Sequence, residues 1–307
     1  MHRDLPRTLR ARSNGIELAY DSFGGDDPEA QPLLLIMGLG TQMIAWDEAF
    51  CEQLAATGYH VIRFDNRDIG ESTRLDHAGV PEVGRLLMQA VAGLPVDAGA
   101  VPYTLADMAA DAVGLLDALG IASAHVVGAS MGGAIGQEIA LRYPKRVRTL
   151  VSIMATSGAP GLPPPTPQAL QVLMTPTPTD RAGYIERHAK VMQVLRGPGA
   201  FPEEEALDAA RAARAFDRGV NPAGYARQLA AIIASGSRKE RLAFLLTPTL
   251  VLHGDRDPLV PIACGIDVAR TVPGARMVTI PGMGHALPRS TWPAIVDAIA
   301  EHAVWTE

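Results

Sequence analysis

The feature that most constrains the fold is an alternation of short apolar runs with helical patterns along most of the chain. Apolar runs of strand length, rich in β-branched residues, occur at Pro32–Met37, His60–Phe64, His125–Val127, Thr149–Met154, Thr249–His253 and Met277–Ile280. Helical periodicity separates or follows them at Ala45–Thr57, Leu105–Leu119, Gly133–Tyr143, Ile262–Val272 and Pro293–Val304. Strands that alternate with helices form parallel sheets covered on both faces. We therefore predict an α/β fold with a doubly wound, mostly parallel sheet.

The alternation is interrupted between residues 157 and 244. Prolines cluster at Pro160–Pro167, and alanine-rich helical patterns without a strand follow at Asp180–Leu195, Pro202–Phe216 and Pro222–Ser235. We predict a helical cap of residues 157–244, inserted into a core domain of residues 1–156 and 245–307.

A second irregular stretch, Ala78–Pro102, interrupts the pattern earlier in the chain. It contains the apolar piece Leu86–Val91 between turn-rich ends. Long loops inside compact domains often have a function. The stretch is predicted either as a mobile lid or as a long surface loop.

Charge and cysteine content exclude several classes of partner. The net charge is −6 without a run of Lys and Arg, so nucleic-acid binding is not expected. Cys51 and Cys264 are far apart in helical patterns, which indicates neither a disulfide framework nor a Cys-rich metal site. No apolar run reaches the roughly 18 residues of a membrane span. We expect a cytoplasmic protein with no membrane partner.

The segment His125–Gly133 contains the spacing Gly-x-Ser-x-Gly around Ser130. It lies between a predicted strand and a predicted helix, where a serine must occupy a sharp turn that exposes its hydroxyl above the sheet. The helix N-terminus adds partial positive charge beside that hydroxyl. Ser130 is therefore a candidate nucleophile, and the alternative is a helix-capping serine between packing glycines.

A serine nucleophile needs a base and a carboxylate that orients the base. Asp257 follows the predicted strand Thr249–His253, and His285 follows Met277–Ile280 in a glycine-containing loop. The order nucleophile, acid, histidine is the one that strand-to-helix serine turns of this type require. Asp255 remains a competitor for the acid role, since either carboxylate could be only a turn residue.

The other histidines are weaker candidates for the base. Several lie in or beside predicted strands or near the termini, where a structural role is expected: His60, His125, His253, His2 and His302. Two lie in the irregular stretch and the predicted cap, where they could only touch a substrate: His77 and His188.

Acyl transfer also needs backbone amides for the developing oxyanion. Met131 follows the serine and offers one amide, and Leu39, in the Gly-Leu-Gly turn after an early strand, offers the second. A glycine-rich turn with no such role is the alternative. Gly38 and Gly40 do not match the spacing of phosphate-binding loops. The carboxylates of Asp65–Ser72 are expected to brace the site through hydrogen bonds rather than to bind metal, because no His or Cys accompanies them.

From about Gly15 to Ala303 the chain resembles the α/β-hydrolase superfamily. The resemblance rests on the Met37–Gly40 turn, the Asp65–Ser72 loop, the Gly128–Gly133 turn, and the pair formed by Gly254–Asp257 and His285. The segments Phe64–Asp68 and Pro281–Pro288 further resemble a bacterial subgroup that contains carboxylesterases and aclacinomycin methylesterase. The resemblance implies ester hydrolysis, no cofactor and a helical cap. Many members have His-Gly where this chain has Met37-Gly38, so the hydrogen bonds around this turn are expected to differ from those of such members.

These features together predict a serine carboxylesterase that acts on small to medium, largely apolar esters with water as co-substrate. C–C bond hydrolysis, lactone hydrolysis and cofactor-free perhydrolysis are related alternatives, and a non-catalytic ligand receptor is a remote one. No metal is implied. Methionines of the irregular stretch and the cap are predicted to contact substrate together with Gly38 and Gly40, or else to pack between cap and core: Met88, Met174 and Met192.

Overall fold

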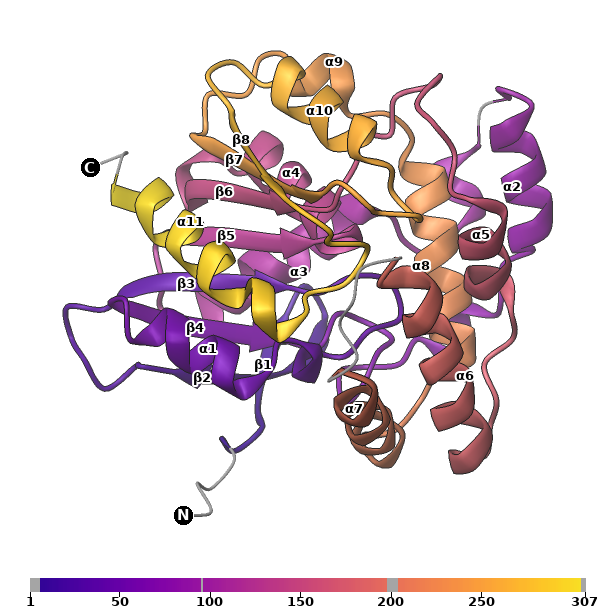
Figure 1. Cartoon of the computed structure of the whole chain (residues 1–307), viewed down its shortest axis with the longest axis horizontal. Helices are drawn as coiled ribbons and strands as arrows, with labels where there is room; N and C mark the ends of the chain where they lie inside the picture. The colour runs from indigo at the N-terminus through magenta and orange to yellow at the C-terminus, as the bar shows by residue number, and fades with distance from the viewer. Residues whose placement is uncertain (1–5, 95, 198–203, 305–307) are drawn as a thin grey trace.

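Parallel pairing of buried strands forms the centre of the molecule (Figure 1). The computed structural model describes residues 6–94, 96–197 and 204–304. Within these ranges the strands form one sheet in the order β1-β2-β4-β3-β5-β6-β7-β8. Only the β1–β2 and β2–β4 pairs in this sheet are antiparallel. The strand bounds are β1 Leu9–Ser13, β2 Ile16–Phe23, β3 Gln31–Ile36, β4 Tyr59–Phe64, β5 Ala124–Ala129, β6 Val147–Ile153, β7 Thr249–Gly254 and β8 Arg276–Ile280. The doubly wound, mostly parallel sheet predicted from the sequence is confirmed.

The hairpin β1–β2 is absent from the predictions. Its turn is Asn14-Gly15, with φ of 47° and 79°, and Ser13 pairs with Ile16 across it. Both turn residues occupy the left-handed region that two-residue hairpin loops require, which Asn-Gly tolerates best. That dipeptide was the sequence signal for this edge of the sheet.

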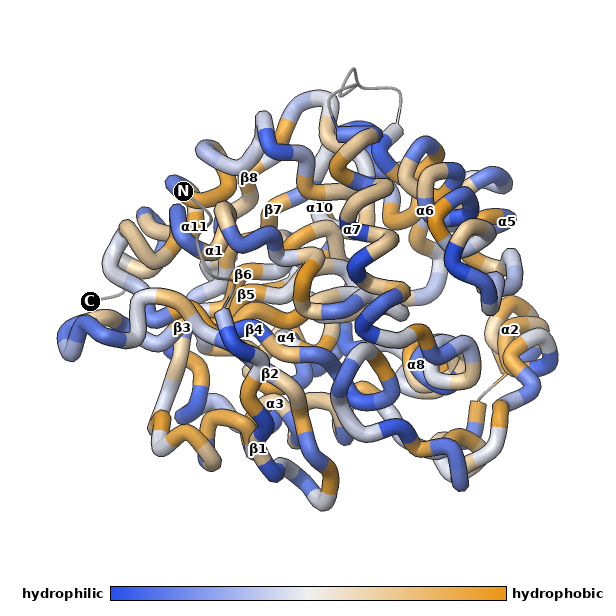
Figure 2. Tube along the Cα trace, turned by 90° about the horizontal axis from the view of Figure 1, so that it is seen from below, coloured by the Kyte–Doolittle hydropathy of each residue, from blue (hydrophilic) through white to orange (hydrophobic). Residues whose placement is uncertain are grey.

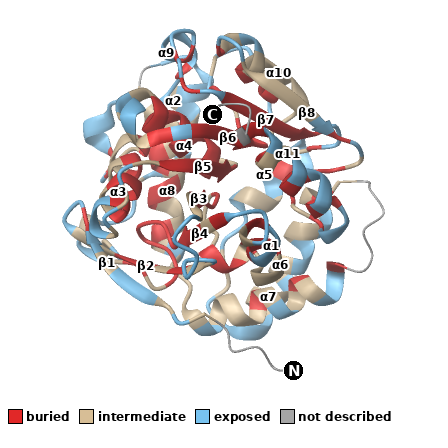
Figure 3. Ribbon diagram, turned by 90° about the vertical axis from the view of Figure 1, so that its left-hand side faces the viewer, coloured by how far each residue is buried: buried red, intermediate tan, exposed pale blue. Residues whose placement is uncertain are grey.

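Helices cover both faces of the sheet. Alternation along β3 sends Leu34 and Ile36 to the face packed by α3, α4 and α10, and Leu33 and Leu35 to the face packed by α1 and α11. Figure 3 shows the central strands of the sheet as the most buried part of the molecule. The bounds of these helices are α1 Glu48–Ala55, α3 Leu105–Ala118, α4 Met131–Arg142, α10 Ile262–Thr271 and α11 Trp292–Val304. No helix in the described ranges is both long and apolar enough to cross a bilayer.

A helical insertion, α5–α9, connects β6 to β7 on the side of the molecule toward which the parallel strands point (Figure 1). Its helices are α5 Pro167–Met174, α6 Arg181–Leu195, α7 Glu204–Arg218, α8 Pro222–Ser235 and α9 Lys239–Leu242. The predicted start of one helix, Pro202, lies outside the described residues. The sequence analysis missed α5, although Pro167 at its first position and Thr166, which accepts a hydrogen bond from the Ala169 amide, are start signals.

The stretch 78–102 is more regular than the loop that was one of our two predictions for it. Residues Val83–Val91 form the helix α2, with short 3₁₀ turns at Asp76–Ala78 and Ala98–Ala100. Leu86 is buried against Val101 and against Ala230 of α8. Burial of this apolar side chain between two helices explains why the stretch is ordered into a helix, which lies beside α8 (Figure 2).

Candidate functional site

Ser130 occupies a strained turn between β5 and α4. Its φ of 57° and ψ of −120° lie outside the regions that non-glycine residues normally adopt. A Cβ at Gly128 would overlap the Gly132 carbonyl, and a Cβ at Gly132 would overlap the Ile36 carbonyl. The two glycines therefore permit the close approach of helix and strands that forces this turn.

The three residues predicted as a triad lie together. Asp257 follows β7 and His285 follows β8, and the His285 Nδ1 atom is 2.8 Å from Asp257 Oδ2. The His285 Nε2 atom is 2.9 Å from Ser130 Oγ. Because an ionised carboxylate can only accept, Nδ1 carries the ring hydrogen and Nε2 is left to accept from the serine hydroxyl. This is the tautomer in which His285 can remove the proton of Ser130.

The surroundings of Asp257 keep its carboxylate ionised. Its Oδ1 accepts hydrogen bonds from the Leu259 and Val260 amides at 2.9 and 2.8 Å. Burial alone would raise the pKa of Asp257, but the facing His285, the nearby His253 and the Val260 amide together hold this pKa well below its usual range. Asp255 is exposed and accepts from the Gly282 amide, so the loop places it away from His285 as a turn residue.

His253 supports the same loop from the strand side. It is fully buried, and its Nε2 lies 2.7 Å from the Val260 carbonyl oxygen and 3.6 Å from Asp257 Oδ2. His253 therefore has the structural role that was expected of it, and this role is to hold the segment whose amides bind Asp257. The sequence analysis did not identify that contribution to the site.

The loop 37–43 between β3 and α1 lies against the nucleophile. A Cβ at Gly38 would lie 3.1 Å from the Ser130 Cβ atom, so glycine permits the approach. Leu39 and Met131 both line the cavity above Ser130. Met131 is the first residue of α4, where a backbone amide has no partner inside its own helix. Leu39 and Met131 therefore both border the cavity beside the nucleophile.

A cavity of about 530 Å³ separates Ser130 and His285 from the helical insertion. Apolar side chains form much of its wall, among them Leu39, Val191, Leu195 and Leu229. His188 on α6 is one of several polar residues of the wall, and its ring stacks on Tyr184 with 6.4 Å between centroids. Burial and the neighbouring arginines of the insertion lower the pKa of His188 to about 4, so its imidazole is neutral near pH 7.

The predicted substrate contacts fall into two groups. Gly38, Gly40 and Met192 line the cavity. Met88 and Met174 do not line it, and they are 75% and 40% exposed. The reason is helical geometry, because α2 turns Leu86 inward and leaves Met88 outside. On α5, the cavity is lined by Val172 and Leu173 and not by Met174.

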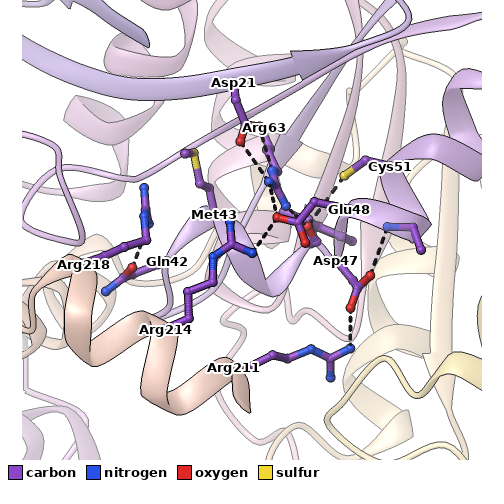
Figure 4. Close-up of polar contacts among 12 residues, drawn as sticks. Asp21, Gln42, Met43, Asp47, Glu48, Cys51, Arg63, Arg211, Arg214 and Arg218 are labelled. Carbon is purple, nitrogen blue, oxygen red and sulfur yellow. Dashed lines mark hydrogen bonds and ion pairs between the residues drawn. The ribbon is translucent and has the colours of Figure 1, made fainter. Parts of the chain in front are cut away.

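Arginines of the insertion bind carboxylates of the core, a feature that the sequence analysis missed. On α7, Arg211 contacts Asp47 at 3.0 Å and Arg214 contacts Glu48 at 2.7 Å (Figure 4). These arginines and Arg218 recur at helical spacing on one stripe of α7, and that stripe was the available signal.

The Asp65–Ser72 loop is hydrogen-bonded as expected. Asp65 accepts from the Met43 and Glu71 amides at 2.7 and 3.0 Å, and Arg218 of α7 approaches it to 2.9 Å. Its oxygens are therefore engaged by protein donors. Across the described ranges, no three His, Cys, Asp or Glu side chains are grouped as metal ligands.

Comparisons with known proteins give matches in both sequence and fold. Residues 31–288 match the family model described as alpha/beta hydrolase fold. The chain is 33% identical over 311 residues to a rhodomycin D methylesterase from Streptomyces sp. strain C5, covering 93% of this chain and 95% of the relative. A crystal structure of a hydrolase from Pseudomonas aeruginosa PA01 is 27% identical, with a TM-score of 0.70 and 97% of both chains covered. A meta-cleavage product hydrolase from Pseudomonas fluorescens IP01, at 21% identity and a TM-score of 0.73, shares the fold.

Proposed function

Because the chain belongs to the α/β hydrolase family, we propose that it is a serine carboxylesterase whose triad is Ser130, His285 and Asp257. The observation that carries the proposal is the position of His285, which lies 2.9 Å from Ser130 Oγ and 2.8 Å from Asp257 Oδ2 at the wall of the cavity. A hydroxyl, a base of the correct tautomer and an ionised orienting group are the parts that acyl transfer requires.

Acylation begins when Ser130 Oγ attacks the ester carbonyl and His285 Nε2 takes the hydroxyl proton. Asp257 stabilises the imidazolium that forms. The amides of Leu39 and Met131 donate hydrogen bonds to the tetrahedral oxyanion. His285 then returns the proton to the leaving alcohol, and an acyl-enzyme remains on Ser130.

Deacylation repeats these steps with water as the nucleophile. His285 removes a proton from the water, the acyl-oxygen bond to Ser130 breaks, and the carboxylic acid leaves. The reaction needs no metal or organic cofactor, because each proton and charge is handled by His285, Asp257 and the two amides.

The proposed substrate is the methyl ester of a bulky, mostly apolar acid. The apolar wall of the 530 Å³ cavity supports this class, and the relative at 33% identity is named as a methylesterase. Binding sites of this volume hold molecules of drug size. Neutral His188 is proposed as a hydrogen-bonding contact for a polar group of the acid part.

The test measures hydrolysis of methyl and p-nitrophenyl esters by wild type and Ser130→Ala, together with labelling by a fluorophosphonate. We expect Ser130-dependent labelling, and a loss in kcat of about 10⁶-fold in the variant. Retained activity in Ser130→Ala would refute the triad. Labelling of Ser130 without turnover of any ester would instead favour C–C bond hydrolysis.

A further inference from the structure

The loop 37–43 is held by side chains from outside itself. The Met37 carbonyl accepts from Asn66 Nδ2 at 2.9 Å, and the Met43 amide donates to Asp65 Oδ1 at 2.7 Å. Between these ends, the Gly40 amide donates to Gln228 Oε1 at 2.8 Å. In the part of the chain that the structure describes, no acceptor engages the Leu39 amide. The anchors thus hold the backbone on both sides of the Leu39 amide.

Gln228 reaches this loop from α8 of the helical insertion. Its side chain is 0% exposed, and its Nε2 donates to the Arg67 carbonyl at 2.9 Å. A backbone amide can only donate and a carbonyl can only accept, so these two partners define the orientation of the Gln228 amide. Gln228 therefore links the loop after β3 to the loop after β4.

The contact at Gly40 leaves no space for a side chain. Gly40 has a φ of +65°, and Tyr225 of α8 packs on it so closely that a Cβ would overlap the ring. Glycine at 38 and 40 leaves the intervening peptide planes with little intrinsic preference. The turn also has two hydrogen bonds of its own, because the Thr41 amide donates to the Gly38 carbonyl at 3.3 Å and the Thr41 hydroxyl donates to the Leu39 carbonyl at 3.1 Å. The acceptor at the Gly40 amide is the external contact that adds to them in holding one orientation of this turn.

Helix α8 is itself a firm base for Gln228. The neighbouring Arg227 donates to both carboxylate oxygens of Asp68, at 2.8 and 2.7 Å, and both side chains are buried. Helix α7 holds the far end of the loop, where Gln42 donates to the Ala215 and Gly219 carbonyls and accepts from Arg218 (Figure 4).

We propose that Gln228 is a positioning residue, through which the helical insertion completes the oxyanion hole of the core. By accepting from the Gly40 amide it holds the turn in which the Leu39 amide points at the oxyanion. The inference rests on the proposed function, since it assigns Gln228 a part in the same acyl transfer. The insertion then has a role beyond covering the substrate.

The experiment compares Gln228→Met, which keeps the volume but removes both hydrogen bonds, with wild type. The matched control is Gln137→Met, because Gln137 of α4 is equally buried and bonds Ser152 and Arg238 away from the loop. Steady-state kinetics on p-nitrophenyl butyrate give kcat and KM, and a trifluoromethyl ketone that forms an oxyanion on Ser130 gives an inhibition constant. Fluorophosphonate labelling gives a rate and an endpoint, and thermal unfolding gives the stability of each variant.

We expect Gln228→Met to lower kcat and the labelling rate by about ten- to a hundredfold, below the 10²- to 10³-fold lost with a whole oxyanion donor. The ketone should bind more weakly by the same factor as kcat/KM, while KM and the labelling endpoint change less than threefold. Gln228→Glu should keep more of the wild-type kcat than Gln228→Met at the same pH, because a carboxylate still accepts from the Gly40 amide although it cannot donate to the Arg67 carbonyl.

Several outcomes overturn the proposal. One is a labelling rate of Gln228→Met within twofold of wild type, and another is a rise in KM with no change in kcat. A third is an unchanged labelling rate with losses of thermal stability and labelling endpoint equal to those of Gln137→Met. The labelling readout needs no knowledge of the natural substrate. Failure at Gln228 is therefore distinct from failure of the proposed function, which Ser130→Ala tests.

Discussion

The core and the helices α6 and α7 of the insertion are held in place by different forces. Strand β5, which leads to Ser130, is buried along its whole length, and both faces of the sheet are packed by apolar helices. In contrast, α6 has no buried residue, and α7 buries Glu204 and Asp208 with only Ala212. Figure 3 shows the same difference in burial. Apolar packing does not depend on ionisation, whereas arginine–carboxylate pairs do, so the two regions should respond to different perturbations.

The largest expected effect concerns the core side of the site. Asp257→Asn should lower kcat by about 10⁴-fold, because the amide no longer selects the productive tautomer of His285. Asp255→Asn is the matched control, and its kcat should stay within about threefold because the exposed Asp255 carboxylate accepts from the Gly282 amide rather than from His285. Steady-state kinetics measure kcat for both variants. A larger loss of kcat in Asp255→Asn than in Asp257→Asn would show that Asp255 is the acid of the triad.

On the insertion side, removal of a buried charge should have the next largest effect. Arg227→Met leaves Asp68 buried without its bidentate partner, which typically costs about 3–5 kcal/mol of unfolding free energy. Urea unfolding measures this loss. The double variant Arg227→Met with Asp68→Asn should recover part of it, since no uncompensated charge remains. Equal losses in the single and double variants would contradict the buried-charge explanation.

Acid should loosen the insertion before the core. Burial would raise the pKa of Asp47, but Arg211 lowers this pKa below its ordinary value. Burial would likewise raise the pKa of Glu48, but Arg63 and Arg214 lower it. The stabilisation from such carboxylates is complete above their unfolded pKa of about 4 and is lost as the pH falls toward the folded value. Asp65 opposes this trend, because burial raises its pKa despite Arg218.

Hydrogen exchange between pH 5 and 3 tests this order of events. Amides of α7 should lose protection at a higher pH than those of β5, and raised salt should narrow the difference because it screens partly exposed pairs. Simultaneous loss of protection in both elements would show that the insertion is not held separately by its charges.

The smallest expected effect is on KM, and it should differ between variants of Met192 and Met88. Met192→Ala should raise KM for a bulky methyl ester by about three- to tenfold, because its side chain lines the cavity, while Met88→Ala should leave kcat/KM unchanged. Parallel kinetics on both variants decide this. A larger KM change in Met88→Ala would indicate that α2 contacts the substrate in solution.

Strand and helix positions near the site follow from local patterns, and most of them agree with the structure within a few residues. The nucleophile turn could be predicted because Gly128 and Gly132 are needed for steric reasons at fixed spacing from Ser130. The parallel sheet could be predicted because both faces of each central strand are buried, which leaves a continuous apolar run. The β1–β2 hairpin was missed because half-exposed edge strands lack that run.

Contacts between distant segments could not be predicted in the same way. Gln228 and Gly40 are 188 positions apart, and no local pattern marks a glutamine as the acceptor for a loop amide. The exclusion of Met88 and Met174 from the cavity likewise depends on which helical face another helix covers.

The sequence by itself determined the order of the parallel strands and of the helices that cover them, the strained position of Ser130 and the residues that can act as acid and base. These properties depend on steric and chemical constraints that span a few residues. Only the tertiary structure decided that Asp257 rather than Asp255 meets His285, and that α7 and α8 hold the loop 37–43. Such choices depend on which side chains come within hydrogen-bonding distance of one another when the sheet and the insertion pack together.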